Sequence, residues 1–184
     1  MIKNDKWIKK MSFDYKMIEP FSENQIKKDN VSFGTSSYGY DARISNEFMI
    51  MKTNKKIVID PKKKCDELFE NIKVKDYIEI PPNSMVLGKS VEYFKIPRNV
   101  LTIAFGKSTY ARCGIIVNVT PFEPEWEGYA TISISNITLV PIVVYANEGI
   151  IQILFFEMND VCDVSYADRN GKYNKQKKII TAKI

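Results

Sequence analysis

Residues 129–136 of this chain read Tyr-Ala-Thr-Ile-Ser-Ile-Ser-Asn, and their alternation decides the fold class. Apolar side chains fall on every second residue, which is the period of a β-strand with one buried face. Because side chains two residues apart leave a strand on the same side, Thr131 and Ser133 point the same way. The stretch predicts a strand with one packed face and one face that meets something polar.

Short strand-like runs make up most of the remaining chain. They are rich in β-branched and aromatic residues, are closed by Gly, Pro or Asn, and comprise 57–61, 77–82, 85–88, 100–106, 114–119, 142–145 and 150–156. Only two short helices are expected, at Lys6–Met11 with Asp5 as cap, and around Glu67–Ile72. Many short strands without long helices between them predict a mainly β fold, a sandwich or a barrel.

Gln152 is the single polar residue in the apolar run 150–156. A run that is apolar on both faces indicates a buried strand, in which an amide needs hydrogen-bond partners. Two alternatives stay open: Gln152 bonds to neighbouring backbone, or it contacts a ligand or a neighbouring subunit.

The composition describes one compact domain. The chain has 184 residues, of which 45% are hydrophobic, 27% charged and 12% aromatic, which suits a sizeable core and argues against disorder. No apolar run approaches the roughly 20 residues that cross a bilayer, and the N-terminus lacks the apolar core of a signal peptide. We expect a cytoplasmic protein.

The chain contains no histidine, which excludes a Ser-His-Asp triad. Its three cysteines, Cys65, Cys113 and Cys162, are far apart and form no C-x-x-C, so a zinc site is not expected. An odd number of cysteines also fits a reducing compartment. Hydrolytic chemistry would therefore depend on carboxylates, hydroxyls, Arg, Lys or a metal carried by the substrate.

The net charge of +5 is concentrated at the C-terminal end, because 169–184 holds six basic residues and no acidic one. Such a segment is often a solvated end. The alternatives are a flap that closes on a polyanionic ligand, or an arm that binds nucleic acid.

Residues 106–112 read Gly-Lys-Ser-Thr-Tyr-Ala-Arg and combine a glycine, two hydroxyls and two cations after a predicted strand. A Walker A loop is excluded, because Leu101 stands where its first glycine would be. The segment still has the groups that bind anions, and the open alternatives are a phosphate site and a solvated turn. The following loop, 120–128, holds three carboxylates and Trp126, which fits either a surface loop or acid/base chemistry.

Several longer motifs follow one another along nearly the whole chain. They are Ser36–Arg43, Val91–Phe94, Gly106–Gly114, Asn118–Pro121, Glu123–Gly128, Tyr145–Gly149, Ser165–Arg169 and Gly171–Tyr173. With these motifs the chain resembles the bacterial dCTP deaminases. The resemblance implies a distorted dUTPase-like β-barrel with a short N-terminal helix and a flexible basic C-terminal tail. It also implies a homotrimer with active sites between subunits.

The family's reaction and site residues come with the resemblance. In this family a glutamate, hydroxyl groups and an arginine activate a water that attacks C4 of the cytosine of dCTP, without zinc, and ammonia and dUTP are released. The matching positions are Lys107, Ser108, Thr109, Tyr110, Ala111 and Arg112 for the triphosphate and the water, Thr131, Ile132 and Ser133 for the base, and Gln152, Tyr166, Lys172 and Gln176 for further contacts. Ser108 and Arg112 match the residues nearest the chemistry. Mg²⁺ would arrive on the triphosphate, dCTP and dUTP are the expected ligands with dTTP as a possible inhibitor, and neither a membrane nor a specific nucleic acid is expected.

The chain departs from its family at two places. Ser133 stands at the position of the catalytic glutamate, and a Ser hydroxyl has no accessible anionic form near neutral pH. Loss of a general base typically costs about 100- to 10,000-fold in rate, which puts ordinary deamination in doubt. In the tail, Lys175 and Lys177 replace glycines that flank the family's glutamine, here Gln176.

These observations lead to one domain over 1–168, a nucleotide-covering tail over 169–184, and competing functions. The first is zinc-independent deamination of dCTP in pyrimidine deoxynucleotide supply, with turnover that is normal, slow or supported by another group such as Glu123 or Glu127. The alternative is a nucleotide-binding pseudoenzyme that senses or sequesters dCTP, dUTP or dTTP. A dUTP diphosphatase and a basic-tail nucleic-acid binder are weaker alternatives, since one lacks a placeable carboxylate and the other a reader motif.

Overall fold

The structure is a computed structural model that describes residues 1–52, 58–63 and 65–182. Its elements run in the order α1 (Asp5–Tyr15), β1 (Ile18–Glu19), β2 (Gly34–Ser36), β3 (Gly39–Met51), the 3-10 helix η1 (Asp66–Leu68), β4 (Phe69–Lys73), β5 (Tyr77–Ile80), β6 (Ser84–Lys95), β7 (Val100–Gly106), α2 (Ser108–Arg112), β8 (Ile115–Asn118), β9 (Glu127–Asn136), β10 (Ile142–Tyr145) and β11 (Gly149–Glu157). The predicted mainly β class with a short N-terminal helix is confirmed.

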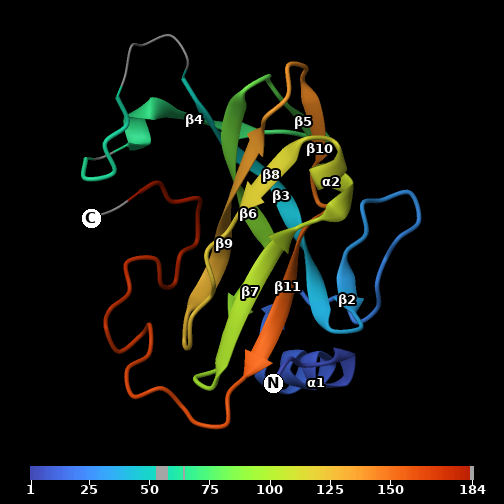
Figure 1. Cartoon of the computed structure of the whole chain (residues 1–184), viewed down its shortest axis with the longest axis vertical. Coiled ribbons are helices and arrows are strands. Elements are labelled where there is room, and N and C mark those ends of the chain that lie inside the picture. Colours follow the sequence, from blue (N-terminus) through green and yellow to red (C-terminus); the bar gives the residue numbers. More distant parts are fainter. Residues whose placement is uncertain (53–57, 64, 183–184) are drawn as a thin grey trace.

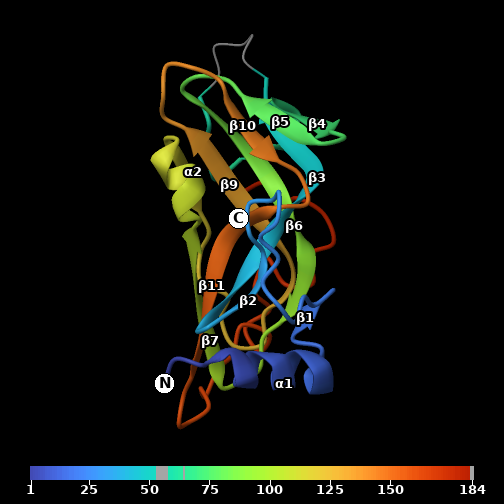
Figure 2. The same cartoon turned by 90° about the vertical axis from the view of Figure 1, so that its right-hand side faces the viewer.

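One curled sheet contains nine strands. Six of them follow the order β7-β11-β3-β6-β9-β8, while β1 pairs with β6, and β2 and β4 pair with β3. The remaining two strands, β5 and β10, pair with each other in a separate ribbon. The end strands β7 and β8 contact each other. Gly106 of β7 lies so close to Val117 of β8 that a Cβ added to Gly106 would be 3.0 Å from Cβ of Val117. The sheet therefore nearly closes into a barrel, and α1 lies across one end of it (Figures 1 and 2).

The core fills the inside of this barrel. Ile132 and Ile134 of β9 are fully buried there with Ile153 and Phe155 of β11, whereas Thr131 and Ser133 are partly exposed. The alternation that the sequence predicts for 129–136 is thus confirmed. Burial of each large apolar side chain contributes about 1.5–3 kcal/mol to the stability of the fold. A shift of β9 by one residue would move these side chains to the outer face, so the observed register is strongly preferred.

Both predicted helices need correction. The first helix begins one residue earlier than predicted because Asn4, and not Asp5, is the N-cap: Oδ1 of Asn4 accepts from the backbone N–H of Trp7 at 3.1 Å. The same helix continues past the predicted Met11 to Tyr15. Residues 67–72 do not form a helix. Only η1 forms there, and β4 then pairs with β3, because ladder hydrogen bonds to an adjacent strand satisfy the backbone better than an isolated turn.

The predicted strand runs are confirmed except at 57–61, and the strands β1, β2 and β3 fall outside the predicted runs. In the run 57–61, Ile57 lies outside the described residues, and Val58, Ile59 and Asp60 belong to no strand. The longest strand, β3, was not predicted, because the polar residues Asp41, Arg43 and Glu47 interrupt its pattern. Arg43 is accommodated by the buried Glu92 of β6, whose Oε1 accepts from Nε of Arg43 at 2.7 Å. Tertiary pairing thus offsets a composition that locally disfavours a strand.

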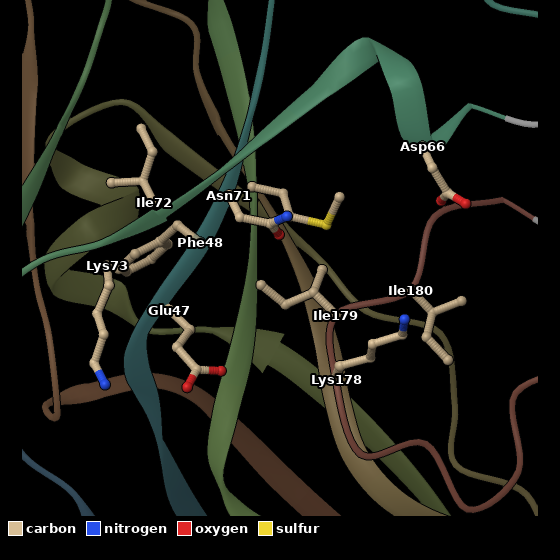
Figure 3. Close-up of a pocket in the computed structure, with 10 residues that line it drawn as sticks. Glu47, Phe48, Asp66, Asn71, Ile72, Lys73, Lys178, Ile179 and Ile180 are labelled. Atoms are coloured by element: carbon tan, nitrogen blue, oxygen red, sulfur yellow. The ribbon is translucent and has the colours of Figure 1, made fainter.

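The described part of the C-terminal tail packs against the edge of β9. The N–H of Lys175 donates to the carbonyl of Glu127 at 2.7 Å, and the N–H of Tyr129 donates to the carbonyl of Gln176 at 3.0 Å. Further on, Lys178, Ile179 and Ile180 face Phe48 of β3 and Asn71 of β4 across a pocket of about 630 Å³ (Figure 3). The hydroxyl of Thr181 donates to Asp66 of η1. The tail is therefore tied to the barrel at Lys175 and Gln176 and again at Thr181.

Candidate functional site

A cleft of about 910 Å³ lies between the outer face of β9 and the C-terminal tail. Thr131 and Ser133 form one wall, and Asn118 of β8 stands beside Ser133 in the register. The other walls come from the 120–126 loop, from Tyr166 and from the tail, and include Glu123, Trp126, Tyr173, Gln176 and Ile180. The polar face of β9 that the sequence predicts therefore lines this cleft.

The three base-facing positions differ in what they offer to a ligand. Ser133 presents its hydroxyl to the cleft, whereas the hydroxyl of Thr131 already accepts from the N–H of Ile180 at 3.3 Å. Ile132 is fully buried on the opposite face, so it can offer only backbone groups to the cleft.

Glu123 is the only carboxylate among the described residues that line this cleft, and it forms an ion pair with Arg169. The other two acids of the loop are also engaged. Glu125 pairs with Arg98 at 2.7 Å, and Glu127 accepts from the hydroxyl of Tyr93 at 2.9 Å. Burial, followed by this hydrogen bond to Glu127, raises the pKa of Tyr93 to about 12. Glu123 is thus the loop acid placed to act in the cleft.

Two residues that the resemblance singled out, Tyr166 at the end of the domain and Gln176 in the tail, hold the tail closed. The hydroxyl of Tyr166 accepts from the N–H of Tyr173 at 3.0 Å, and the carbonyl of Tyr173 accepts from Nε1 of Trp126 at 2.8 Å. Gln176 is 6% exposed, and its Nε2 donates to the carbonyl of Tyr129 at 2.7 Å. Its Oε1 is buried and has no hydrogen-bond partner within residues 1–52, 58–63 and 65–182. Lys172 lies in the same segment, with an exposed side chain.

The segment 107–112 sits elsewhere, at the end of β7. Ser108, Thr109, Ala111 and Arg112 are exposed on α2, where Nη1 of Arg112 donates to the carbonyl of Ser108 at 3.0 Å. Tyr110 points into the core, its hydroxyl accepts from the N–H of Tyr145 at 3.0 Å, and burial raises its pKa to about 12. The side chain of Tyr110 therefore anchors α2, and its neighbours remain available to a ligand.

Gln152 lies near this segment, between Asp41 of β3 and Phe105 of β7 in the register. Its Nε2 donates to the hydroxyl of Ser36 at 3.3 Å. The amide thus has a side-chain partner, which neither of the two alternatives named for it had specified.

One chain does not bring the two groups of predicted residues together. Neither Gln152 nor any residue of 107–112 lines the cleft that holds Thr131, Ser133, Tyr166 and Gln176. In Figure 1, α2 lies on one side of the molecule and the tail runs along the other side, beyond β9. Sequence reasoning gave no role to the residues that secure these parts, Asp66, Asp41 and Ser32, because their partners lie far away along the chain.

Among residues 1–52, 58–63 and 65–182, no three His, Cys, Asp or Glu side chains gather as metal ligands would. Within the same residues, no helix has the length and apolar character needed to span a bilayer.

Comparison with known proteins decides the family. The DCD family, described as dCTP deaminase-like, matches residues 2–158. The chain belongs to the dCTP deaminase-like family. Among curated members of this family, the dCTP deaminase of Nitrosomonas europaea is 57% identical over 187 residues, covering 100% of this chain and 99% of the relative. The dCTP deaminase of Chlamydia muridarum is 58% identical over 184 residues, covering 97% of this chain and 96% of the relative.

A solved structure supports the family fold. The dCTP deaminase of Agrobacterium tumefaciens superposes with a TM-score of 0.63 at 18% identity, over 84% of this chain and 47% of that longer chain. This likeness concerns the fold alone. The family assignment made from the motifs is confirmed, and so is the barrel.

Proposed function

We propose that this protein is a dCTP-binding member of its family that hydrolyses the amino group of cytosine at a rate limited by Ser133. The observation that carries the proposal is the polar face of β9, which opens into a cleft closed by the tail. Family membership supplies the ligand, because curated relatives at 57% and 58% identity are dCTP deaminases.

The reaction sets the chemical requirement of the cleft. Water adds to C4 of the cytosine, the C4–N bond breaks, the amino group leaves as ammonia, and the oxygen of the water becomes the C4 carbonyl of dUTP. A general base must take a proton from the water, and a hydroxyl such as that of Ser133 cannot do so near neutral pH. Glu123 is the carboxylate in the cleft that can take over this role, once its ion pair with Arg169 opens.

We further propose that the complete site forms between subunits of a homotrimer. Two features support this: Ser108 and Arg112 are exposed on α2, and neither lines the cleft of its own chain. The α2 of one subunit would then bring hydroxyl and guanidinium groups to the nucleotide that lies in a neighbour's cleft. Apolar side chains exposed beside α2, Phe105 at 56% and Ile116 at 52%, fit burial between subunits.

Mg²⁺ belongs to the substrate in this proposal, because a triphosphate carries it through its own oxygens. Asp41, the carboxylate that contacts Lys107 just before α2, fits a metal ligand poorly, since its Oδ2 already accepts from Lys107 and from Gln25. We expect dUTP to bind as the product and dTTP to compete with dCTP.

A second function, nucleotide binding without turnover, is favoured by one observation. Among the described residues that line the cleft, Glu123 is the single carboxylate, and it is paired with Arg169, so none of these residues offers a free carboxylate to the ligand in this state. Such a protein would sense or sequester dCTP, dUTP or dTTP.

One experiment separates the two functions. Ammonia and dUTP release from dCTP and Mg²⁺ is measured for the unmodified chain, Ser133→Glu and Glu123→Gln, with calorimetric dCTP binding for each. Slow turnover by the unmodified chain that is lost in Glu123→Gln would support deamination with Glu123 as the base. Binding without turnover, together with turnover by Ser133→Glu, would support the second function. Absence of dCTP binding would refute both.

A further inference from the structure

A small apolar cluster, separate from the barrel core, is built by β3, β4, β6, η1 and the C-terminal tail. Its buried members are Met49, Cys65 and Phe69. Partly buried apolar side chains pack against them, namely Met51, Leu68, Met85, Leu87 and, from the tail, Ile179. We call these residues the satellite cluster. Through Ile179, the satellite cluster ties the tail to the barrel by apolar contact.

A polar contact lies beside the satellite cluster. The hydroxyl of Thr181 donates to Oδ1 of Asp66 on η1, and Thr181 is 6% exposed. Asp66 directly follows Cys65, a buried member of the cluster. Figure 3 shows Asp66 reaching from η1 toward the tail. Ile179 and Thr181, two positions apart in the tail, are therefore both held on the same part of the barrel.

Ile180, which stands between these two tail residues, faces the nucleotide cleft. Among the described residues, it is the one that lines both this cleft and the pocket between the tail and β3 and β4. Its N–H donates to the hydroxyl of Thr131 at 3.3 Å. In Figure 3, the side chains of Ile179 and Ile180 project to opposite sides of the tail. Contacts outside the cleft thus fix a residue that forms part of its wall.

Two anchors hold the tail, and the stretch between them is short and exposed. The first anchor is Gln176, whose carbonyl accepts from the N–H of Tyr129 at 3.0 Å. The second is formed by the two tail residues held at η1 and the satellite cluster. Lys177 and Lys178, between the anchors, are exposed. Segments with few buried apolar contacts open locally at a small cost in free energy, so the second anchor decides how often the end of the tail leaves the cleft.

We propose that Asp66 and the satellite cluster form a seat for the end of the tail and act as positioning residues for the nucleotide site. By fixing the residues on either side of Ile180, the seat holds Ile180 against Thr131 and keeps Gln176 in the cleft. Asp66 is not among the described residues that line the cleft, so it acts through the tail and not by touching the nucleotide. This inference rests on the proposed nucleotide binding and gives a function to the segment that joins β3 to β4.

A double-mutant cycle between η1 and the tail tests the proposal. The rate constant koff and the Kd of dCTP with Mg²⁺ are measured for the unmodified protein, Asp66→Ala, Thr181→Val and the double variant. Loss of one hydrogen bond shifts an equilibrium by about 2- to 13-fold, so each single variant is expected to raise koff and Kd by such a factor. The rise in Kd is expected to come from koff, because the seat acts on the closed tail and not on the encounter. The double variant is expected to exceed neither single variant.

The apolar half of the seat is tested by Ile179→Ala. Each buried CH₂ group shifts an equilibrium by about fourfold, and Ile179 is only partly buried, so koff is expected to rise by about tenfold.

Limited trypsin digestion reports on the seat without any nucleotide. Lys177 and Lys178 are exposed cleavage sites between the two anchors. Cleavage of a transiently released segment follows the population of its released form. Tail cleavage is therefore expected to rise in Asp66→Ala, Thr181→Val and Ile179→Ala by about the same factor as koff, while the Tm of the barrel stays unchanged.

Glu67→Ala is the matched control, because it removes a carboxylate from the next residue of η1. Glu67 is exposed and is not among the described residues that line the cleft or the pocket. Its koff, Kd and tail cleavage are expected to equal those of the unmodified protein. If Asp66→Ala does not fold, Thr181→Val tests the same hydrogen bond from the tail and leaves the barrel unaltered.

Three results would overturn the inference while leaving the proposed function intact. In the first, koff and tail cleavage stay unchanged in every seat variant. In the second, tail cleavage rises but koff and Kd do not, which would make the seat purely structural. In the third, Glu67→Ala raises koff as much as Asp66→Ala does. Failure of the unmodified protein to bind dCTP would overturn the inference and the proposed function together, and the binding measurement on that protein alone reveals this case.

Discussion

Gln176 allows a sharp test of whether the cleft binds a nucleotide, because only one of the two polar atoms of its side-chain amide has a hydrogen-bond partner among the described residues. Nε2 donates to the carbonyl of Tyr129 at 2.7 Å, while Oε1 is buried and finds no partner among the residues that the structure describes. We interpret this unpaired oxygen as an acceptor kept for a donor on the nucleotide. The substitution Gln176→Met keeps the length and approximate volume of the side chain but removes both polar atoms.

The two energy terms oppose each other in the protein without nucleotide. A buried carbonyl that loses its donor, here that of Tyr129, costs about 1–3 kcal/mol, and removal of the unpaired Oε1 recovers about the same amount. The unfolding free energy of Gln176→Met is therefore expected to change by less than about 2 kcal/mol. For a chain of this size that is a change in Tm of less than about 8 °C.

With nucleotide bound, nothing offsets the loss. A hydrogen bond between Oε1 and the ligand contributes about 0.5–1.5 kcal/mol, so the Kd of dCTP should rise roughly 2- to 13-fold. Thermal unfolding measures the first quantity, and calorimetric titration with dCTP and Mg²⁺ measures the second.

Asn136 serves as a matched control because its buried amide is fully satisfied. Nδ2 donates to the carbonyls of Ile80 and Val140, and Oδ1 accepts from the N–H of Thr138 at 2.8 Å. Asn136→Leu should destabilise the fold by about 3 kcal/mol or more, since several buried groups lose partners and no unpaired atom is removed. If Gln176→Met destabilises as strongly as Asn136→Leu and leaves the Kd unchanged, Gln176 is structural and the interpretation is refuted.

Three further predictions concern the phosphate segment, the core and the tail. Arg112→Ala should weaken dCTP binding at least about tenfold by calorimetry, because it removes the guanidinium expected to meet the phosphates, and an unchanged Kd would exclude that role. Ile132→Ala should lower the unfolding free energy by about 2–5 kcal/mol in urea titrations, whereas Ser133→Ala on the outer face should change it little; equal losses would contradict the assigned faces of β9. Hydrogen bonds from Arg98 and from the N–H of Ser165 lower the pKa of Asp168 from 3.8 to about 2, so the order that this carboxylate gives to the 163–168 turn should be lost as the pH falls from about 4 to 2. Asp168→Asn should abolish this acid transition in NMR spectra, and its persistence would assign it to another group.

Much of the fold and part of the site could be predicted from local patterns. Alternation identified β9 and its polar face, because the period of a strand depends only on the order of residues. The same reasoning failed for β3, where Asp41 and Arg43 are stabilised by partners on other elements, Lys107 and Glu92. It failed at 67–72 as well, since pairing with β3 decides that stretch.

The amino-acid sequence by itself determined the mainly β class, the exclusion of histidine-dependent chemistry, the family, and the presence of Ser133 on the same strand face as Thr131. These properties depend on residue identity and on spacing along one strand. Only the tertiary structure decided that Ser133 and Glu123 share a cleft, that the cleft is separate from α2, and that Lys107 is bound to Asp41. The physical reason is that hydrogen bonds and ion pairs between residues 66 positions apart, as Asp41 and Lys107 are, leave no periodic trace in the chain and form only when the barrel closes.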